Sequence, residues 1–452
     1  MAPFARREGE LVGQVLGRFI SSLSQDEMAP SLRHDAKRAL LNYVGGVLGV
    51  VENPVVDGAI RVMAAFSGPE KTTLVGRPER LDAMGASFVN AIAANLLDFD
   101  DTHPNTVAHY TSVVAPPLLA LAEARRLPGR QVLDAFIIGF EVGARLGNSV
   151  QPGHYTHGWH ITATSGVFGA AAGCARLLGL SAEHAAQALG LAASQSGSVM
   201  ENLTTEGKNV GVGNAARNGL LSALLAQEGF TAAPAAIEGT FGWARVLGQE
   251  PKLGEIVDGL GERWELPKNT YKPYPSGVVF HAVIDAARAL RERMDLSAAD
   301  IASVVVRGDQ LMIDRGDRGV ENARDSRVST HHSAAIGLAL GKAGVREHTA
   351  PVAFDPEIVA LRRKVRSELA ADMPPWSASV TVQTVDGRTD TVTVEHARGS
   401  VQSPMSDADL EAKFRDNAAI GGSADKAGAR MAAIWAMEES SDLAPLMRSM
   451  GA

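Results

Sequence analysis

The stretch from Thr162 to Leu178 constrains the fold most, because almost all of its residues are small and apolar. A helix that is apolar on every side is buried by its neighbours. The sequence therefore predicts a central helix here, enclosed by others. Aromatic residues make up only 5% of the chain, whereas it contains 46 glycines. This composition favours closely packed helices with small residues at their crossings.

Helical periodicity recurs on both sides of this stretch. Leu32, Ala36 and Leu40 fall on one face of a helix over 31–48, and Ser31 is its predicted N-cap. Further helices are predicted over 1–23, 81–97, 113–126, 131–150, 181–194 and 212–228. The last contains Gly213 within a match to the dinucleotide-binding fingerprint, but no strand precedes it, so we reject a nicotinamide site.

The pattern changes near residue 270. Tyr271-Lys272-Pro273-Tyr274-Pro275 cannot be helical, because it holds two prolines. A strand over 301–306 and a hairpin around Asp386-Gly387 follow, with helices over 281–293 and 330–340. Helical spacing returns from Asp407. We predict a mostly α protein with an all-helical domain (1–269 and 403–452) and a smaller α+β domain (270–402).

Charge and cysteine content exclude several classes of partner. The formal net charge of −8 gives no general attraction for nucleic acid or an anionic membrane. Cys174 is the single cysteine, so an intramolecular disulfide and a cysteine-based zinc site are excluded, and its apolar surroundings predict a buried, inert thiol. Gln14 and Arg18 interrupt what would be the apolar core of a signal peptide, so we expect a cytoplasmic protein.

An acidic stretch links two of the predicted helices. It reads Leu96-Leu97-Asp98-Phe99-Asp100-Asp101-Thr102-His103-Pro104 and continues to His109. Carboxylates at a helix C-terminus are unfavourable, because the helix dipole already places negative charge there. The stretch is either a solvated loop that caps the next helix or part of a binding site. Its acids and histidines suit a hard divalent ion, but no spacing template matches, so we assign no metal.

Several other polar residues lie in predicted loops at helix ends. Histidines suit proton transfer near neutral pH, and lysines suit the binding of carboxylates. Together they suggest a site that holds a di- or tricarboxylate and moves a proton beside one carboxylate. His157 has an alternative, structural role, because a histidine in a glycine-rich turn often only packs and hydrogen-bonds within that turn. The candidate residues are Asp98, Thr102, His103, His109, His157, His160, Lys208 and Lys272.

Two further polar segments lie in the predicted α+β domain. Arg324-Asp325-Ser326-Arg327 is predicted to be a charged surface loop, although arginine is the usual clamp for a carboxylate. His331-His332 is predicted to be one helical turn with one side buried.

The chain resembles the MmgE/PrpD family over essentially its whole length. The resemblance is carried by ordered motifs at matching intervals: Leu97-Asp98-Phe99-Asp100-Asp101-Thr102-His103-Pro104, His109 before an apolar run, His157-Gly158-Trp159-His160, Lys208 ahead of Gly213-Asn214-Ala215-Ala216-Arg217-Asn218-Gly219, and Lys272-Pro273-Tyr274-Pro275.

The resemblance implies a large helical domain, a smaller α+β lid, an active site in the cleft between them, a homodimer and no organic cofactor. It assigns Asp98 and Thr102 as the acid and hydroxyl of the acidic motif, His109 and His160 as the site histidines, and Lys208 and Lys272 as the site lysines. Gly277 stands where decarboxylase-like members place a histidine, although His281 fits a later one. His331-His332 occupies a helix start where members often carry an aromatic residue.

We expect a cofactor-independent enzyme that moves a proton at the carbon next to a carboxylate of a small di- or tricarboxylate. The resemblance favours a lyase, either a dehydratase or a decarboxylase of a methylcitrate- or aconitate-like acid. An epimerase or isomerase of an iminodisuccinate-like dicarboxylate is the first alternative. A non-catalytic, carboxylate-binding helical protein is the second.

Overall fold

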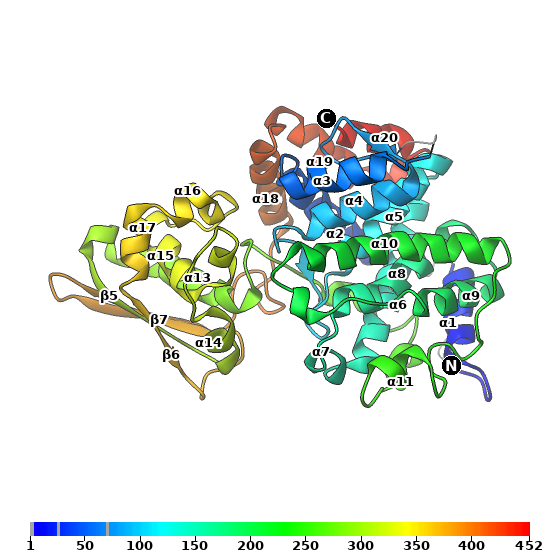
Figure 1. Ribbon diagram of the computed structural model, residues 1–452, viewed down its shortest axis with the longest axis horizontal. Helices are drawn as coiled ribbons and strands as arrows, with labels where there is room; N and C mark the ends of the chain where they lie inside the picture. The colour runs from blue at the N-terminus through cyan, green and yellow to red at the C-terminus, as the bar shows by residue number, and fades with distance from the viewer. Residues whose placement is uncertain (1–3, 25–27, 69–71) are drawn as a thin grey trace. The chain divides into compact units, whose positions relative to one another are not determined.

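Helices dominate the structure, which confirms the predicted mostly α class (Figure 1). The structure is a computed structural model that describes residues 4–24, 28–68 and 72–452. The chain divides into two compact units. The helical unit comprises residues 1–96, 100–269 and 407–452, and the α+β unit comprises residues 97–99 and 270–406.

The helical unit contains long helices and a few very short strands. Its helices are α1 (Val12–Ser22), α2 (Pro30–Leu48), α3 (Pro54–Ala64), α4 (Ala83–Asn95), α5 (Tyr110–Arg125), α6 (Gly129–Val150), α7 (Gly153–Thr156), α8 (Ile161–Leu177), α9 (Ala182–Ala193), α10 (Glu206–Gln227), α11 (Trp243–Leu247), α12 (Gly254–Val257), α18 (Asp407–Ile420), α19 (Ala427–Trp435) and α20 (Ala444–Met450). Its two-residue strands are β1 (Thr72–Thr73), β2 (Arg80–Leu81) and β3 (Asp101–Thr102).

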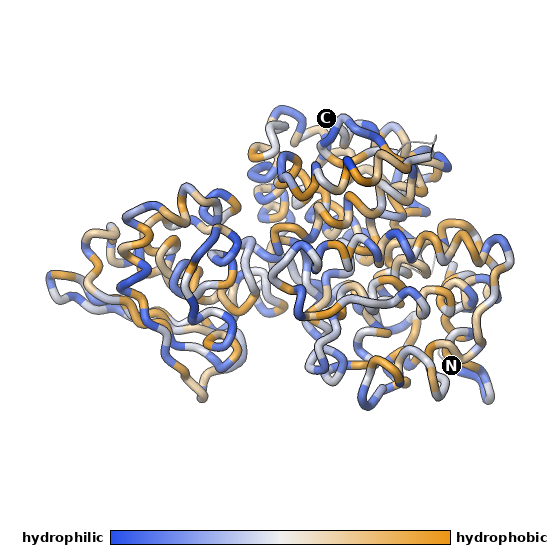
Figure 2. The backbone as a smooth tube through the Cα atoms, in the orientation of Figure 1, coloured by the Kyte–Doolittle hydropathy of each residue, from blue (hydrophilic) through white to orange (hydrophobic). Residues whose placement is uncertain are grey.

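Helix α8 is the buried centre that the sequence predicted. All but one of its residues are buried, and α5, α6, α9 and α10 pack against it. Small residues permit this density: a Cβ on Gly139 of α6 would lie 2.6 Å from the carbonyl oxygen of Gly169 in α8. Figure 2 shows that α10 is more polar in its first half and more apolar from Leu220 onward. Cys174, on α8, is buried as predicted.

Three helix starts differ from the predictions. Helix α2 begins at Pro30 with Ala29 as its N-cap, so Ser31 is not the cap: proline suits the first helical position. Helix α1 begins only at Val12, since Gly9 adopts a left-handed φ of 77° that interrupts a helix. Residues 1–3 of that predicted helix lie outside the described residues. Helix α10 begins earlier than predicted, at Glu206.

The α+β unit holds a four-stranded sheet. Its elements are β4 (Thr270–Tyr271), α13 (His281–Met294), β5 (Ile301–Gly308), α14 (Gln310–Gly316), α15 (Thr330–Leu340), α16 (Ala350–Ala353), α17 (Pro356–Arg362), β6 (Val365–Leu369), β7 (Ala378–Thr384) and β8 (Thr389–Val394). The sheet order is β6-β5-β7-β8, with β5 parallel to β6 and antiparallel to β7. The predicted hairpin is confirmed as β7 and β8.

One face of this sheet is covered by helices α13 and α15 (Figure 1). Val304, Val306 and Val380 point into this core, which is apolar. On the other face, the Thr381 and Thr391 hydroxyls form an exposed cross-strand hydrogen bond of 2.8 Å. The α+β unit therefore has a one-sided sheet with its own core, as alternating strand sequences predict.

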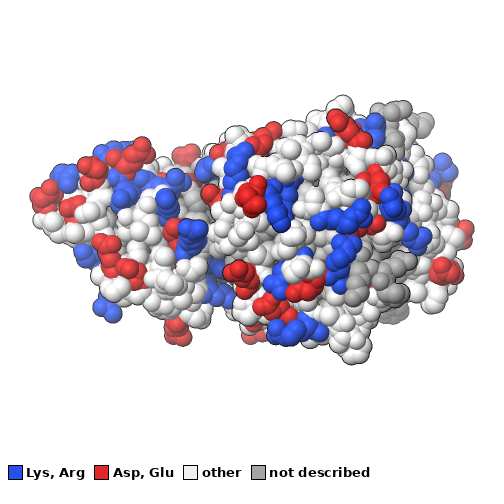
Figure 3. Space-filling model, turned by 90° about the horizontal axis from the view of Figure 1, so that it is seen from above, with Lys and Arg blue, Asp and Glu red and all other residues white. Residues whose placement is uncertain are grey.

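In the part of the chain that the structure describes, no helix is both long enough and apolar enough to cross a lipid bilayer. On the face drawn in Figure 3, acidic and basic side chains are interspersed rather than gathered by sign. Local charge therefore matters more than a general field for any anionic ligand.

Candidate active site

The acidic stretch is buried rather than solvated. Asp100 and Asp101 are 4% and 0% exposed. The Asp100 carboxylate accepts hydrogen bonds of 2.7 Å from Asn95 Nδ2 and Ser112 Oγ. Asp101 Oδ2 accepts similar bonds from Thr111 and Asn269. Burial and the neighbouring Asp100 carboxylate raise the pKa of Asp101 to about 6. These two acids fix the stretch between the end of α4 and the start of α5.

His109 is the N-cap residue of α5 and is 8% exposed. Its Nδ1 lies 2.6 Å from the carbonyl oxygen of Asp101 and 3.3 Å from Thr102 Oγ1. Because a carbonyl oxygen only accepts, we assign the proton of the neutral ring to Nδ1. The lone pair of that tautomer is then on Nε2, the nitrogen suited to act as a base.

His160 is the N-cap residue of α8 and is 4% exposed. Its backbone N–H donates to the carbonyl oxygen of Ser198 over 3.1 Å. Two residues further on, the Thr162 hydroxyl accepts a hydrogen bond from the backbone N–H of His109 over 3.2 Å. The first turn of α8 thus joins the two candidate histidines through backbone and side-chain contacts.

Lys208 lies in the first turn of α10 and is 5% exposed, whereas the sequence predicted a loop. The helix begins early because the Thr205 hydroxyl caps it by accepting from the Gly207 N–H. The next residue, Asn209, donates to both the backbone and side-chain oxygens of Asn95, which in turn binds Asp100. The start of α10, which carries Lys208, is therefore hydrogen-bonded to the acidic stretch through Asn209 and Asn95.

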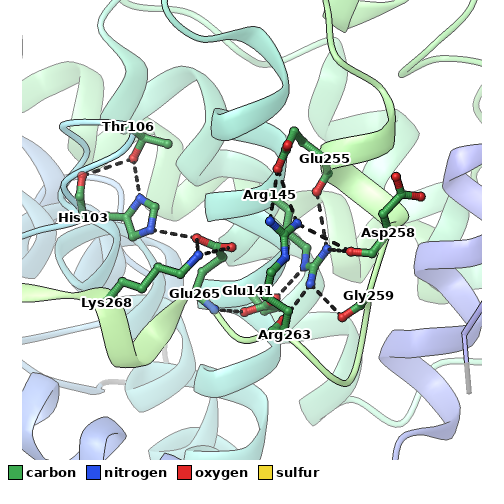
Figure 4. A network of polar contacts seen from close by, with 10 residues as sticks. All are labelled: His103, Thr106, Glu141, Arg145, Glu255, Asp258, Gly259, Arg263, Glu265 and Lys268. Atoms are coloured by element: carbon green, nitrogen blue, oxygen red, sulfur yellow. Dashed lines mark hydrogen bonds and ion pairs between the residues drawn. The ribbon is translucent and has the colours of Figure 1, made fainter. Parts of the chain in front are cut away.

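His103 is enclosed by polar contacts of the helical unit (Figure 4). It is 0% exposed, and its Nδ1 and Nε2 lie 2.9 Å from Thr106 Oγ1 and 3.1 Å from Glu265 Oε2. Burial lowers the pKa of His103. Burial alone would raise the pKa of Glu265, but hydrogen bonds from His103 and Lys268 outweigh it and lower that pKa to about 2. A neutral imidazole bound to a carboxylate favours a structural role for His103 over the predicted substrate contact.

A buried arginine continues the same network. Arg145, 0% exposed, forms an ion pair with Glu141 on the same helix. It also donates to four backbone carbonyls, those of Glu255, Asp258, Gly259 and Arg263. The other Glu141 oxygen accepts from the Glu265 N–H over 2.7 Å. The segment from 255 to 268 is thereby attached to α6 (Figure 4).

His157 does not join the buried residues of the helical unit. It is exposed at the end of α7, while the neighbouring His154 is 0% exposed and bonded to Leu247 O and Thr164 Oγ1. Burial lowers the pKa of His154 to about 4. The packing role that we considered for His157 belongs to His154 instead.

The α+β unit contains three of the predicted residues. Lys272 Nζ, on a side chain that is 4% exposed, lies 3.0 Å from Asp98 Oδ1 and 3.1 Å from the Asp98 carbonyl oxygen. Asp98 has a left-handed φ of 54°, which aspartate tolerates better than most residues. His281, 4% exposed, begins α13 and donates from Nε2 to the carbonyl oxygen of Ser276.

One polar residue of the α+β unit was misplaced by the sequence analysis. Arg327 lies on a 3-10 helix (Asp325–Val328) and is only partly exposed, with Ser326 beside it fully buried, so this segment is not a surface loop. Arg327 and Val328 precede Ser329, the N-cap residue of the largely apolar helix α15. No local pattern in the sequence indicated that this segment is partly buried.

Comparison with known proteins identifies the family. Residues 14–255 match the MmgE/PrpD N-terminal domain, and residues 274–439 match the MmgE/PrpD C-terminal domain. The chain therefore belongs to the MmgE/PrpD family, as its motifs suggested.

Several relatives share the name of one activity. Cis-aconitate decarboxylase from Mus musculus is 30% identical over 421 residues, covering 88% of this chain and 85% of the relative. The Homo sapiens enzyme of the same name is 31% identical over 402 residues, covering 85% and 82%. The enzyme from Aspergillus terreus (strain NIH 2624 / FGSC A1156) is 28% identical over 300 residues, covering 63% and 61%.

Proposed function

We propose that this chain is a lyase that acts on an aconitate-like tricarboxylic acid, with decarboxylation as its reaction. Family membership and the activity named for its relatives support this proposal. The structural observation that carries it is the placement of the candidate groups in the helical unit. His109 and His160 occupy the N-cap positions of α5 and α8, and Lys208 lies in the first turn of α10. Helix N-termini favour anions, so cationic and proton-transfer groups coincide with local positive potential despite the net charge of −8.

We assign the substrate contacts to the lysines and the proton step to a histidine. Lys208 and Lys272 bind carboxylates as point charges. Asp98, paired with Lys272, orients that ammonium group. Thr102 and the carbonyl oxygen of Asp101 hold the His109 ring so that Nε2 is the nitrogen that exchanges a proton.

In the decarboxylation, the bond between a carboxylate and its carbon breaks and carbon dioxide leaves. The electron pair is delocalised through the carbon–carbon double bond of the acid into the carboxylate at the far end of that bond, as an enolate-like anion. Lysine charges and helix N-termini stabilise this charge because they are oriented before the reaction begins. A histidine that carries a second proton as an imidazolium then transfers it to one of the carbons that share the charge, which gives a neutral imidazole and a dicarboxylate with one carbon fewer. A dehydratase would use the same groups to remove a proton and release water.

The homodimer and the lid role of the α+β unit are parts of this proposal, and they rest on the family resemblance alone. Light scattering on the purified chain measures the first directly. Hydrogen exchange with and without cis-aconitate tests the second, since a lid should gain protection in residues 270–406 when the acid binds.

Incubation with cis-aconitate in deuterium oxide tests the reaction. We expect carbon dioxide release and a five-carbon unsaturated dicarboxylate with one solvent deuterium, both detected by NMR and mass spectrometry. Deuterium incorporation without loss of carbon dioxide or water would favour an epimerase. Binding without turnover across citrate-, aconitate- and iminodisuccinate-like acids would favour a non-catalytic carboxylate-binding protein.

Variants connect the reaction to the residues. His160→Asn and Lys208→Met should each lower kcat/KM by roughly 100-fold or more, the range expected when a general acid–base or a preorganised charge is removed. The matched controls are His396→Asn and Lys252→Met, which alter exposed residues and should leave turnover unchanged. Equal activity of His160→Asn and the wild type would contradict the assignment.

A further inference from the structure

Asp100 is a buried carboxylate for which the proposed function has no role. Its Oδ1 lies 3.5 Å from Nδ1 of His109, the histidine to which we assign the proton step. Both residues belong to the helical unit and are buried, at 4% and 8% exposed. Opposite charges attract each other more strongly in such a place than in water, because most of the surrounding water is excluded. The Asp100 carboxylate therefore stabilises a positively charged His109 ring.

The other oxygen of Asp100 fixes the position of the carboxylate. Oδ2 accepts hydrogen bonds of 2.7 Å from Asn95 Nδ2, at the end of α4, and from Ser112 Oγ, in the first turn of α5. Because each helix supplies one of these donors, the carboxylate cannot turn away from His109 without breaking a hydrogen bond. This arrangement holds Oδ1 beside the ring.

The surroundings of His109 otherwise disfavour a positive charge. The residue is the N-cap of α5, and a helix N-terminus carries partial positive charge. Burial also disfavours the charged form of an imidazole. The bond of 2.6 Å from Nδ1 to the Asp101 carbonyl oxygen orients the ring, but both the neutral and the charged ring can donate it. A carboxylate beside Nδ1 opposes the first two effects.

Two further carboxylates of the acidic stretch lie close in sequence. The Asp98 carboxylate lies beside that of Asp100 and forms an ion pair of 3.0 Å with Lys272, so a cation offsets its charge. The Asp101 carboxylate accepts from two neutral side chains, and burial together with the Asp100 charge raises its pKa to about 6. Asp101 meets the His109 ring through its backbone carbonyl instead. The three acids thus have different contacts.

Helices α4, α6, α8 and α10 pack against α5. The sequence of α4 contains no charged residue, and Glu141 of α6 is paired with Arg145. Helices α8 and α10 supply His160 and Lys208 at their starts. A positive charge on either group disfavours a second one on His109. The charged His109 ring therefore depends on the acidic stretch rather than on these helices.

We propose that Asp100 is a positioning residue that keeps His109 in its imidazolium form until the ring gives its proton to carbon. This inference rests on the proposed decarboxylation. After carbon dioxide leaves, Nε2 transfers its proton to one of the carbons that share the negative charge. The ring then returns to its neutral form, with the remaining proton on Nδ1. Asp100 itself transfers no proton and acts only through the ring.

Asp100→Asn tests this role, because it removes the charge and keeps an oxygen that can accept from Asn95 and Ser112. With cis-aconitate as substrate, kcat/KM of the wild type should decline at alkaline pH as His109 loses its second proton. In the variant, the midpoint of that decline should lie lower by about one pH unit or more. Above both midpoints kcat/KM should fall by about 10-fold or more, whereas at acidic pH it should approach the wild-type value.

Four control variants separate this role from a structural one. Asp416→Asn alters an exposed carboxylate of α18 and should leave the pH profile unchanged. Asp100→Glu keeps the charge and should restore most of the midpoint. A shift in Asp98→Asn as large as that in Asp100→Asn would indicate a general effect of the acidic stretch and overturn a specific role for Asp100. If Asp100→Asn does not fold, Ser112→Ala removes one hydrogen bond that orients the carboxylate, and an unchanged midpoint there overturns the role.

NMR titration of the histidine rings without substrate gives a readout that does not need turnover. The signal that His109→Gln removes identifies His109, and its midpoint should lie at lower pH in Asp100→Asn than in the wild type. An unchanged midpoint overturns the role of Asp100 even if cis-aconitate is decarboxylated normally. A lowered midpoint in a protein that does not decarboxylate cis-aconitate supports the pairing of Asp100 with His109 and overturns the proposed reaction.

Discussion

The Arg145 network of the helical unit and the Arg327 region of the α+β unit bury charge in different ways. Arg145 is matched by the Glu141 carboxylate and four backbone carbonyls. Burial lowers the pKa of Arg327 to about 10, and the attraction of the Asp98 carboxylate opposes this only in part. A fully matched network stabilises one arrangement of the chain, whereas a cation whose pKa is lowered by burial costs stability.

The buried histidines show the same contrast. Both ring nitrogens of His103 have partners, Thr106 and Glu265. Among the described residues, His332 Nδ1 and His348 Nε2 have no hydrogen-bond partner, although each ring is bonded through its other nitrogen. Polar groups of this kind cost stability, and proteins retain them mainly at functional sites. The comparison therefore distinguishes a fully hydrogen-bonded network around Arg145 from the region around Arg327, where two buried histidines each keep one ring nitrogen without a partner.

Removal of Arg145 is the strongest test of the rigid network. Arg145→Met should lower the free energy of unfolding by about 3 to 5 kcal/mol, since it leaves the Glu141 carboxylate buried without its partner. Urea denaturation followed by circular dichroism measures the loss. Arg293→Met is the control, because its ion pair with Asp390 is exposed and should contribute less than about 1 kcal/mol. Equal losses of unfolding free energy in the two variants would mean that the buried Arg145 network stabilises the fold no more than an exposed ion pair does.

Acid should weaken the α+β unit through His332. Burial first, and then the positive charge of Arg362, lowers the pKa of His332 to about 4, against a usual value near 6.5 when unfolded. The unfolded chain therefore binds more protons between these values, and stability present above pH 6.5 is lost as the pH falls toward 4. The loss from this residue should reach about 3 kcal/mol.

His332→Gln should remove that part of the pH dependence. Unfolding free energies of the wild type and the variant, measured from pH 7.5 to pH 4, should converge or cross as the pH falls. His396→Gln alters an exposed histidine, and its curve should run parallel to that of the wild type. Parallel curves for His332→Gln as well would mean that His332 does not titrate as its burial implies.

Periodicity identified the elements whose neighbours are mainly apolar. The central helix α8, the helix α15 and the hairpin around Gly387 were all predicted within one or two residues. Strand β6 (Val365–Leu369) was missed, because an edge strand with Arg366 and Glu368 lacks regular apolar alternation. Its pairing with β5 depends on a partner about 60 residues away in sequence, which local pattern cannot reveal.

Residue type indicated which residues to consider for a site, but it did not indicate how exposed each of them is. The sequence indicated Asp98 and Lys272 as functional residues, and the structure joins them in an ion pair. The sequence could not show that His103, unlike His109, is enclosed by a carboxylate, because the Glu265 side chain that binds it lies 162 positions away in sequence. The position of Arg327 was also hidden, since its four-residue segment contains three charges and resembles a surface turn.

The smallest expected effect concerns the hydroxyl beside Arg327. Ser326→Ala removes the contacts of the hydroxyl with His348 and with the carbonyl oxygen of Ala323, and it should cost about 1 to 2 kcal/mol of stability, the usual contribution of one or two hydrogen bonds. Thr73→Val removes a comparable buried contact with Glu123 in the helical unit and should cost a similar amount. Thermal melts measure both losses, and a Ser326→Ala variant as stable as the wild type would mean that the hydroxyl contributes nothing to the fold of the α+β unit.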